Sequence, residues 1–293
     1  MAGVLKDLRT FSVAVNAAFK LALQGDSGSP INDLITDINM STRKVEFPIA
    51  GSVGPMREWK GSRIVTSVMR SSYEIVAKKF EKTISLPVED QEDDNLDIFM
   101  PAIRTLAQAV ANWKSQQVDK AIEANGLAYD DVPFFSASHP EGGLNASNYQ
   151  AGAGPAWYLI DASKPIKPWI WGTRVAPSIK PKTADSDDNV FWRDELVWGA
   201  RARGGPGYGL WQTAYKSKAA LDGPNLEAAE AAMRKRADEN GETLDVVPTL
   251  VLVPPALKWD ARRLFGPATV SGGADNIYQN EYKVVVSNRL TGA

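Results

Sequence analysis

The residue types that most often do chemistry are scarce in this chain. Among its 293 residues there is one histidine, His139, and no cysteine. A Ser/His/acid triad would have to use His139, yet no Gly-x-Ser-x-Gly elbow is present to expose a serine. Without cysteine, carboxylates are the main candidate metal ligands. We therefore interpret His139, in the turn-like segment Ser138–Pro140, as a loop residue and expect no catalytic, cofactor or metal site.

An acidic cluster is the strongest remaining candidate for chemistry. It consists of Glu89, Asp90, Glu92, Asp93 and Asp94. Paired carboxylates can catalyse hydrolysis or bind calcium, but the cluster lacks the glycine and the alternating spacing of a calcium loop. Acidic residues just before a helix are also favoured by the helix dipole. A solvated, helix-starting or interface role is favoured, and a carboxylate-dependent hydrolase remains a distant alternative.

Glycines and tryptophans invite two further ligand hypotheses. The run from Ala200 to Gly209 is rich in glycine, but no Lys-Ser or Lys-Thr pair completes a phosphate loop, so a hairpin turn at 204–209 is favoured. Six of the nine tryptophans lie between residues 157 and 211, and exposed indoles can stack on sugars. Trp169 and Trp171 would share one face of a strand, as would Trp192 and Trp198 in a regular strand. Core or interface packing is the favoured interpretation, because tryptophan is a large apolar anchor.

Composition restricts the class of protein. Hydrophobic residues make up 44% and charged residues 23% of the chain, which is enough to bury a core. Lysine and arginine total 33 against 35 acidic residues, so there is no excess of positive charge for tight binding of nucleic acid. No apolar run reaches the roughly 18 to 20 residues of a membrane span, and the N-terminus lacks a secretion signal. We expect a soluble protein without a membrane partner.

The first third of the sequence predicts exposed elements. Residues 5–23 form an amphipathic helical pattern, whose apolar face is expected to pack either within the subunit or against a neighbour. Strands are predicted at 64–69 and 73–83, with a turn at 70–72. Neither face of the second strand is cleanly apolar. A two-stranded ribbon of this kind is marginal alone, so we expect it to extend outward and to be buried by a partner.

A long helix and a mixed region follow. A helix is predicted over 101–125, roughly 37 Å long, with Pro101 in its first turn and Gly126 at its end. Residues 127–225 read as strands and loops, with turns at 152–155 and 164–168 and a strand at 191–201. A helix is predicted over 226–240, with Asn225 as its cap and Gly241 as its stop. A strand at 249–253, a short helix at 256–265 and a last strand at 282–287 complete the pattern.

The order of these elements resembles the tailed-phage capsid fold first described for phage Hong Kong 97. Several stretches more specifically resemble the Mu-like major head subunit family, often called gpT. They are residues 57–59 (REW), 79–81 (KFE), 86–87 (LP), 92–94 (EDD), 134–135 (FF), 138–140 (SHP), 152–159 (GAGPAWYL), 188–191 (DNVF), 208–212 (YGLWQ) and 253–255 (VPP). Together they span most of the chain from about residue 55 to the end.

This resemblance implies an α+β fold of the Hong Kong 97-type phage major capsid protein, with an N-arm, an extended β-hairpin loop, a peripheral domain with a long spine helix, and an axial domain. It predicts these divisions: an N-terminal arm at 1–46, the extended loop at 47–86, the peripheral domain at 87–150 with the spine helix at 101–125, a Trp-rich β region at 151–224 that is either peripheral or an insertion, the axial domain at 225–275, and a strand returning to the peripheral domain at 276–293.

By the same resemblance, the chain is expected to be a non-enzymatic subunit of a virion. Its expected partners are copies of itself in pentamers and hexamers of an icosahedral shell, scaffold and portal during assembly, decoration or minor capsid proteins, and non-specifically bound double-stranded DNA. It would lie in the capsid, and in the bacterial host cytoplasm during assembly. A virion surface protein that binds carbohydrate or host is the alternative. The inter-subunit contact candidates are Phe11, Phe19, Trp59, Arg63, Arg70, Tyr73, Lys78, Lys82, Glu92, Asp93 and Asp94.

Overall fold

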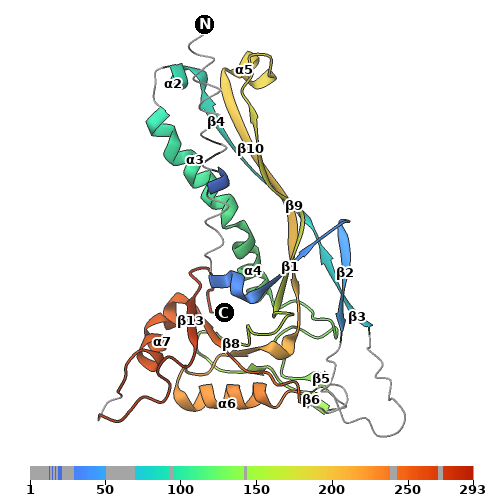
Figure 1. Ribbon diagram of the computed structural model, residues 1–293, viewed down its shortest axis with the longest axis vertical. Helices are drawn as coiled ribbons and strands as arrows, with labels where there is room; N and C mark the ends of the chain where they lie inside the picture. The colour runs from blue at the N-terminus through green and yellow to red at the C-terminus, as the bar shows by residue number, and fades with distance from the viewer. Residues whose placement is uncertain are drawn as a thin grey trace.

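The structure is a computed structural model with an elongated shape, in which a long sheet with a helical layer rises from a more compact base (Figure 1). It describes residues 13, 15, 17, 19–21, 30–50, 70–92, 96–141, 144–237, 243–269 and 273–292. Within these ranges, the side chains of residues 48–50, 70–72, 91, 92, 96–100, 102 and 144 are outside the description. None of the helices in the described ranges is long and apolar enough to cross a bilayer.

The elongated part is built on a four-stranded sheet with the order β1-β9-β10-β4. Its strands are β1 (Ile35–Asn39), β4 (Lys78–Pro87), β9 (Trp169–Lys182) and β10 (Glu195–Tyr208). β9 and β10 form an antiparallel hairpin, to which β4 adds antiparallel and β1 parallel. The strand predicted at 191–201 is only partly confirmed, because its first three residues belong to the short helix α5 (Asp188–Arg193).

The glycine-rich run at the end of β10 is strand, so the turn predicted at 204–209 is wrong. These glycines allow other backbone segments to approach closely. A Cβ at Gly205 would lie 2.3 Å from the carbonyl oxygen of Val76, and a Cβ at Gly204 would lie 2.7 Å from that of Gly172. Glycine inside a strand is typical of such close approaches, and it does not require a chain reversal.

Two consecutive helices, α3 (Leu96–Ala111) and α4 (Trp113–Ala124), cover one face of the long sheet (Figure 1). The prediction of a single helix over 101–125 is therefore corrected to two helices. The helical segment begins earlier, so Pro101 lies inside α3 and not in its first turn. Asn125, in the left-handed conformation with φ 46°, ends α4 where Gly126 was expected to do so. Ile103 of α3 is buried against Leu196 of β10, as the helical spacing of apolar residues predicts.

The base contains a five-stranded sheet with the order β13-β12-β8-β11-β7. The strands are β7 (Tyr149–Gln150), β8 (Trp157–Ile160), β11 (Ala214–Ser217), β12 (Leu250–Val253) and β13 (Lys283–Val286). Helices α6 (Gly223–Arg234) and α7 (Lys258–Phe265) contribute to a core cluster with residues of β8 and β12. The strands predicted at 249–253 and 282–287 and the short helix predicted at 256–265 are thus confirmed.

Helix α6 confirms the predicted helix but corrects its boundaries. Its N-cap is Asp222, whose carboxylate accepts a hydrogen bond from the backbone N–H of Asn225 at 3.0 Å. Asn225, the predicted cap, is therefore already inside the helix. α6 ends at Arg234, well before residue 240, and the predicted stop Gly241 lies outside the described residues.

A two-stranded antiparallel ribbon is formed by β2 (Lys44–Ala50) and β3 (Arg70–Val76). The turn predicted at 70–72 is wrong, because these residues are in β3 and pair with residues 48–50 of β2. The predicted arm at 64–69 lies outside the described residues. The predicted second arm is divided, since residues 73–76 belong to the ribbon and residues 78–83 belong to β4 of the long sheet.

The base of the ribbon is covered by its own subunit. Ile75 and Ala77 are fully buried in a cluster with Met40 and Ile170 of the same chain. The expectation that a partner would bury the ribbon is therefore wrong for this part of it. The N-terminal helix is represented by residues 13, 15, 17 and 19–21, which are helical as predicted, and Val15 and Phe19 are buried against the long sheet and α3.

The remaining short elements connect these layers. They are the 3-10 helices η2 (Pro30–Leu34), η3 (Trp211–Thr213) and η4 (Pro255–Leu257), the strands β5 (His139–Glu141) and β6 (Leu144–Ala146), and the helix α2 (Val88–Glu92). The largest core cluster joins both sheets. Edge-to-face aromatic contacts, such as Trp113 on Trp171 at 4.8 Å between ring centroids, give this core a fixed geometry.

Candidate subunit-contact surfaces

His139 is a buried packing residue, so its interpretation as a loop residue is wrong. Its Nδ1 lies 2.7 Å from the carboxylate of Asp130, and its ring stacks on Trp211 with 4.0 Å between centroids and planes 10° apart. The side chain is inaccessible to solvent. An imidazole that is enclosed between a carboxylate and an indole holds the segment after α4 against η3, and it is not presented to a substrate.

A buried ion pair lies beside this histidine. Arg236 pairs with Glu141 at 3.6 Å, donates a hydrogen bond to the carbonyl of Ser147, and lies over the ring of Trp211 at 5.4 Å. Burial lowers the pKa of Arg236, whereas the Glu141 carboxylate acts in the opposite direction. The paired arginine connects the end of α6 to the β5–β6 hairpin, which is a structural role.

The acidic cluster begins inside a helix. Glu89 and Asp90 are in the first turn of α2, where the helix dipole favours negative charge. Asp93 and Asp94 lie outside the described residues, and Glu92 is described in its backbone alone. Within the described ranges, no group of three or more His, Cys, Asp or Glu side chains is arranged to hold a metal ion.

The tryptophans are mostly core residues, as the favoured interpretation predicts. Trp169 and Trp171 are buried in β9, and Trp198 is buried in β10. The prediction that Trp192 shares a strand face with Trp198 is wrong, because Trp192 belongs to α5 and is 77% exposed. Buried indoles cannot stack on a sugar, so the tryptophan-rich region offers no extended carbohydrate platform.

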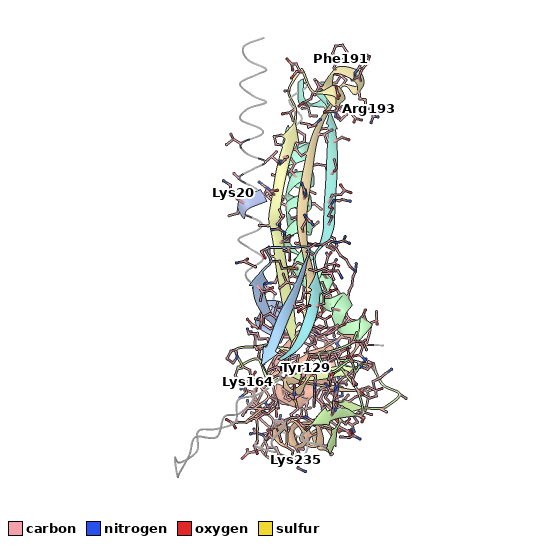
Figure 2. All side chains as sticks on the ribbon, turned by 90° about the vertical axis from the view of Figure 1, so that its right-hand side faces the viewer. Lys20, Tyr129, Lys164, Phe191, Arg193 and Lys235 are labelled. Carbon is pink, nitrogen blue, oxygen red and sulfur yellow. The ribbon has the colours of Figure 1, made fainter. Side chains whose placement is uncertain are left out.

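Helix α5 carries an exposed aromatic pair that the sequence analysis missed. Phe191 is 71% exposed and packs edge-to-face on Trp192 with ring centroids 4.8 Å apart. Asn189 holds the helix in place by donating hydrogen bonds to the carbonyls of Lys182 and Glu195. Figure 2 shows Phe191 and Arg193 at one end of the long sheet, far from the base. Lys164 and Lys235 are labelled at the opposite end, in the base. The aspartates before Val190 could have predicted this helix, because aspartate is favoured at a helix N-terminus and not in a strand.

The contact candidates from the sequence have different placements. Phe19 is only 3% exposed and packs on Ala107 and Ala200 of its own subunit. Tyr73 is half-buried, and burial together with Tyr208 raises its pKa to about 12. Lys78 and Lys82 are exposed on β4, the edge strand of the long sheet. Arg70 and Glu92 are described in their backbones alone, and the remaining candidates, Phe11, Trp59, Arg63, Asp93 and Asp94, lie outside the described residues.

The C-terminal residues are attached to the helical layer by a buried carboxylate. Asp119 of α4 accepts a hydrogen bond from the Ser287 hydroxyl at 2.9 Å and lies 3.5 Å from the Arg289 guanidinium. Burial raises the pKa of Asp119, although Ser287 and Arg289 oppose the shift. The end of the base sheet is therefore tied directly to the long helices.

Comparison with known proteins identifies the family of this architecture. The profile of the family described as "Mu-like prophage major head subunit gpT" matches residues 8–290. This chain belongs to that family. It is 30% identical over 279 residues to the Mu-like prophage FluMu major head subunit of Haemophilus influenzae, covering 90% of each chain. It is also 30% identical over 282 residues to the major capsid protein of Escherichia phage Mu, covering 90% of this chain and 92% of that one.

The solved structures agree with this assignment of the head subunit. A chain of the procapsid of bacteriophage JBD30 has a TM-score of 0.81 and 30% identity, and the match covers 96% of this head subunit and 99% of that chain. A chain of the JBD30 capsid, at 22% identity and a TM-score of 0.79, has the same fold. The α+β phage major capsid fold of the Hong Kong 97 type, expected from the sequence, is therefore confirmed. The protein is a major head subunit, a structural component of the virion.

Proposed function

We propose that this major head subunit assembles into pentamers and hexamers of an icosahedral shell that encloses double-stranded DNA, and that it catalyses no reaction. The observation that supports this most strongly is the match to the JBD30 procapsid chain over nearly the whole length of both proteins. A JBD30 capsid decorated with minor capsid protein trimers contains a chain of the same fold. Minor capsid proteins, scaffold and portal are accordingly proposed as partners, with assembly in the host cytoplasm.

We further propose the following assignment of domains along the chain. Residues 1–46 act as an arm, whose strand β1 pairs with the long sheet, and 47–86 as an extended loop, whose last strand β4 also pairs with that sheet. The peripheral domain comprises 87–150, the spine helices and the long sheet, which includes much of 151–224. Residues 225–275 act as the axial domain, and 276–293 return to the helical layer through Asp119. Because Phe19 is already buried in its own subunit, the exposed Lys78 and Lys82 on the edge strand are the better described candidates for contact with a neighbour.

Assembly can be tested with the purified chain, produced alone and together with a scaffold protein. Negative-stain micrographs are expected to show closed shells that sediment far faster than a subunit of 31.8 kDa. A chain that remains monomeric at high concentration under both conditions, and that binds glycans in an array, would contradict the proposal. The proposal that the subunit catalyses no reaction is tested by hydrolase assays on the assembled shells. Wild-type and His139→Ala shells are expected to show no difference in hydrolytic activity.

A further inference from the structure

In the part of the chain that the structure describes, one face of the long sheet is covered by the ribbon near the base and is open farther along. Along β10, Trp198, Ala200 and Ala202 are buried, whereas the alternating residues Gly199 and Arg201 face the opposite side. Helices α3 and α4 cover the buried side. Figure 2 views the other side, and there the upper parts of β4, β9 and β10 lie in front of α3, with α5 at their far end and no other described helix over them.

Cations dominate the open face. Residues directly opposite each other in neighbouring strands share a face, and the register pairs Arg201 with Glu81, Arg203 with Lys79, and Gly199 with both Thr83 and Lys180. Val197 faces Lys182 in the same way. At these paired positions the open face carries five cations, which are Lys79, Lys180, Lys182, Arg201 and Arg203, against two carboxylates, Glu81 and Glu195. This excess contrasts with the whole chain, in which acidic residues outnumber basic ones. Beyond the strands, Asp188 of α5 lines a pocket beside Lys182 and Val197.

The open face lacks enough counter-charge of its own. Among the described residues, none of its five cations lies within 4.0 Å of a carboxylate oxygen. Glu81 accepts a hydrogen bond from the hydroxyl of Thr83 at 3.0 Å. The Nε of Arg203 is buried without a hydrogen-bond partner in the described part of the chain. Like charges on neighbouring strands destabilise a sheet, so an anionic partner would stabilise this surface.

The chain itself contains a matching anionic segment. Five of the six residues at 89–94 are acidic, and Glu89 is exposed on α2. The backbone N–H of Val88 donates to the carbonyl of Asp194 at 2.9 Å, which fixes α2 at the far end of the sheet. Arg201 lies seven residues along β10 from Asp194, about 23 Å away at the rise of a strand. Glu89 and Asp90 of a subunit therefore lie too far from Arg201 to neutralise the middle of its own open face.

We infer that the open basic face of β4, β9 and β10 binds the acidic first turn of α2, with Glu89 and Asp90, of a second copy of this chain. The inference rests on the proposed function and names one of its contact surfaces. Each copy carries both halves of the contact on different parts of its surface, so the interaction is head-to-side and can continue from copy to copy around a closed shell. Complementary charge of this kind sets register and excludes wrong partners more than it adds raw affinity.

Charge reversal with rescue tests this contact. Lys180→Glu places a carboxylate in the basic face opposite Gly199 and is expected to lower the yield of shells about tenfold. Adding Glu89→Lys to the same chain restores an attractive pair between copies, and the yield should return to within about twofold of the wild type. Lys235→Glu makes the same charge change on α6 in the base and should leave the yield within about twofold. An unchanged yield for Lys180→Glu, or no recovery in the double variant, overturns the inference.

Crosslinking locates the contact independently of yield. Because the wild-type chain has no cysteine, variants that each carry one, Glu89→Cys or Lys180→Cys, can be co-expressed and treated with a short bis-maleimide. A covalent dimer is expected in shells of the mixture and not in a mixture of Glu89→Cys with Trp259→Cys. Absence of the 89–180 dimer in wild-type-like shells overturns the inference but leaves the proposed function intact, whereas failure of the wild-type chain to form shells contradicts the proposed function itself.

Other anionic occupants give different outcomes. If packaged DNA occupies the basic face, Lys180→Glu shells will form normally but contain less DNA, and Glu89→Lys will not correct this. If an acidic scaffold occupies it, the variant will fail to co-sediment with scaffold, again without rescue by Glu89→Lys. Either result replaces the second copy as the occupant and overturns the inference.

Discussion

The hydroxyl of Tyr208 donates a hydrogen bond to the carbonyl oxygen of Ala121 at 2.6 Å and accepts one from the backbone N–H of Gly126 at 2.7 Å. Tyr208 is the last residue of β10, and Ala121 lies in the last turn of α4. Burial raises the pKa of Tyr208, so its hydroxyl stays protonated and can donate. One side chain thus fixes the end of the long sheet to the helical layer that covers it.

Tyr208→Phe should therefore destabilise the subunit. The change keeps the ring, which stacks on Phe134 with centroids 5.3 Å apart, and removes only the hydroxyl. The N–H of Gly126 then loses its partner in a part-buried position, at a cost of about 1–3 kcal/mol. Urea unfolding of the purified subunit measures the loss. Tyr149→Phe is a suitable control, and equal midpoints for the two variants would refute the expected role of the hydroxyl.

Tryptophans of the long sheet and of α5 should respond very differently to truncation. Trp171→Ala removes an indole that is 2% exposed and packs on Trp113, and a cavity of this kind costs about 3–5 kcal/mol. Trp192→Ala removes an indole that is mostly in solvent and should change stability by less than about 0.5 kcal/mol. Thermal unfolding of both variants checks this contrast. A large loss for Trp192→Ala would show that α5 is part of the folded core.

Elements with a strong and regular pattern were predictable from the sequence. Strand β12 (Leu250–Val253) is buried on both faces, and an uninterrupted apolar run between Thr249 and Pro254 is enough to indicate that environment. The last strand and the helices around residues 106 and 229 were also predicted, because their apolar residues follow a strong and regular pattern. The fold itself was predicted through the family resemblance, since no local pattern specifies the order of strands in a sheet.

Errors occurred where a residue has two common uses. Glycine marks both turns and close backbone contacts, so Gly204 and Gly205 could not be assigned without knowing that Val76 lies against them. Proline begins many helices but is also found inside α3. The single histidine gave no sign of its burial, because the partner Asp130 and the stacked Trp211 come from other segments. The open basic face depends on register between three strands, which the sequence does not reveal.

His139→Ala should reduce stability more than it affects any activity. The substitution removes the ring stacked on Trp211 and leaves the carboxylate of Asp130, which is 8% exposed, without its partner. Leaving a buried polar group without its hydrogen-bond partner costs about 1–3 kcal/mol. Asp130→Asn keeps a side-chain oxygen in place and should cost less. A His139→Ala subunit that unfolds at the wild-type urea concentration would show that the pair contributes nothing to the fold.

Asp119→Asn should weaken the dependence of stability on acid pH. Burial raises the folded-state pKa of Asp119, so the folded protein binds this proton more tightly than the unfolded chain does. The stabilisation from this group is complete below the unfolded value near 4 and is lost as pH rises through the higher folded pKa. Urea unfolding between pH 4 and 7 should show a smaller decline for Asp119→Asn than for the wild type. Asp185→Asn, at an exposed position, is the control and should leave the decline of stability with pH as steep as in the wild type. An equally steep decline for Asp119→Asn would contradict this assignment.

Pro101→Ala should stabilise the subunit, because Pro101 lies in the interior of α3 and its side chain is exposed. Proline there lacks the N–H that would donate to the carbonyl of Asp97, and it is about 3 kcal/mol less favourable than alanine inside a helix. Packing of the long sheet on α3 absorbs part of that penalty, so a gain of about 1–3 kcal/mol in unfolding free energy is expected. Pro140→Ala, a proline in the strand β5, serves as the control for losing the ring alone. A Pro101→Ala subunit that is less stable than the wild type would contradict this expectation and show that the proline ring contributes to the fold. Sedimentation of the two variants shows whether either change affects the formation of shells.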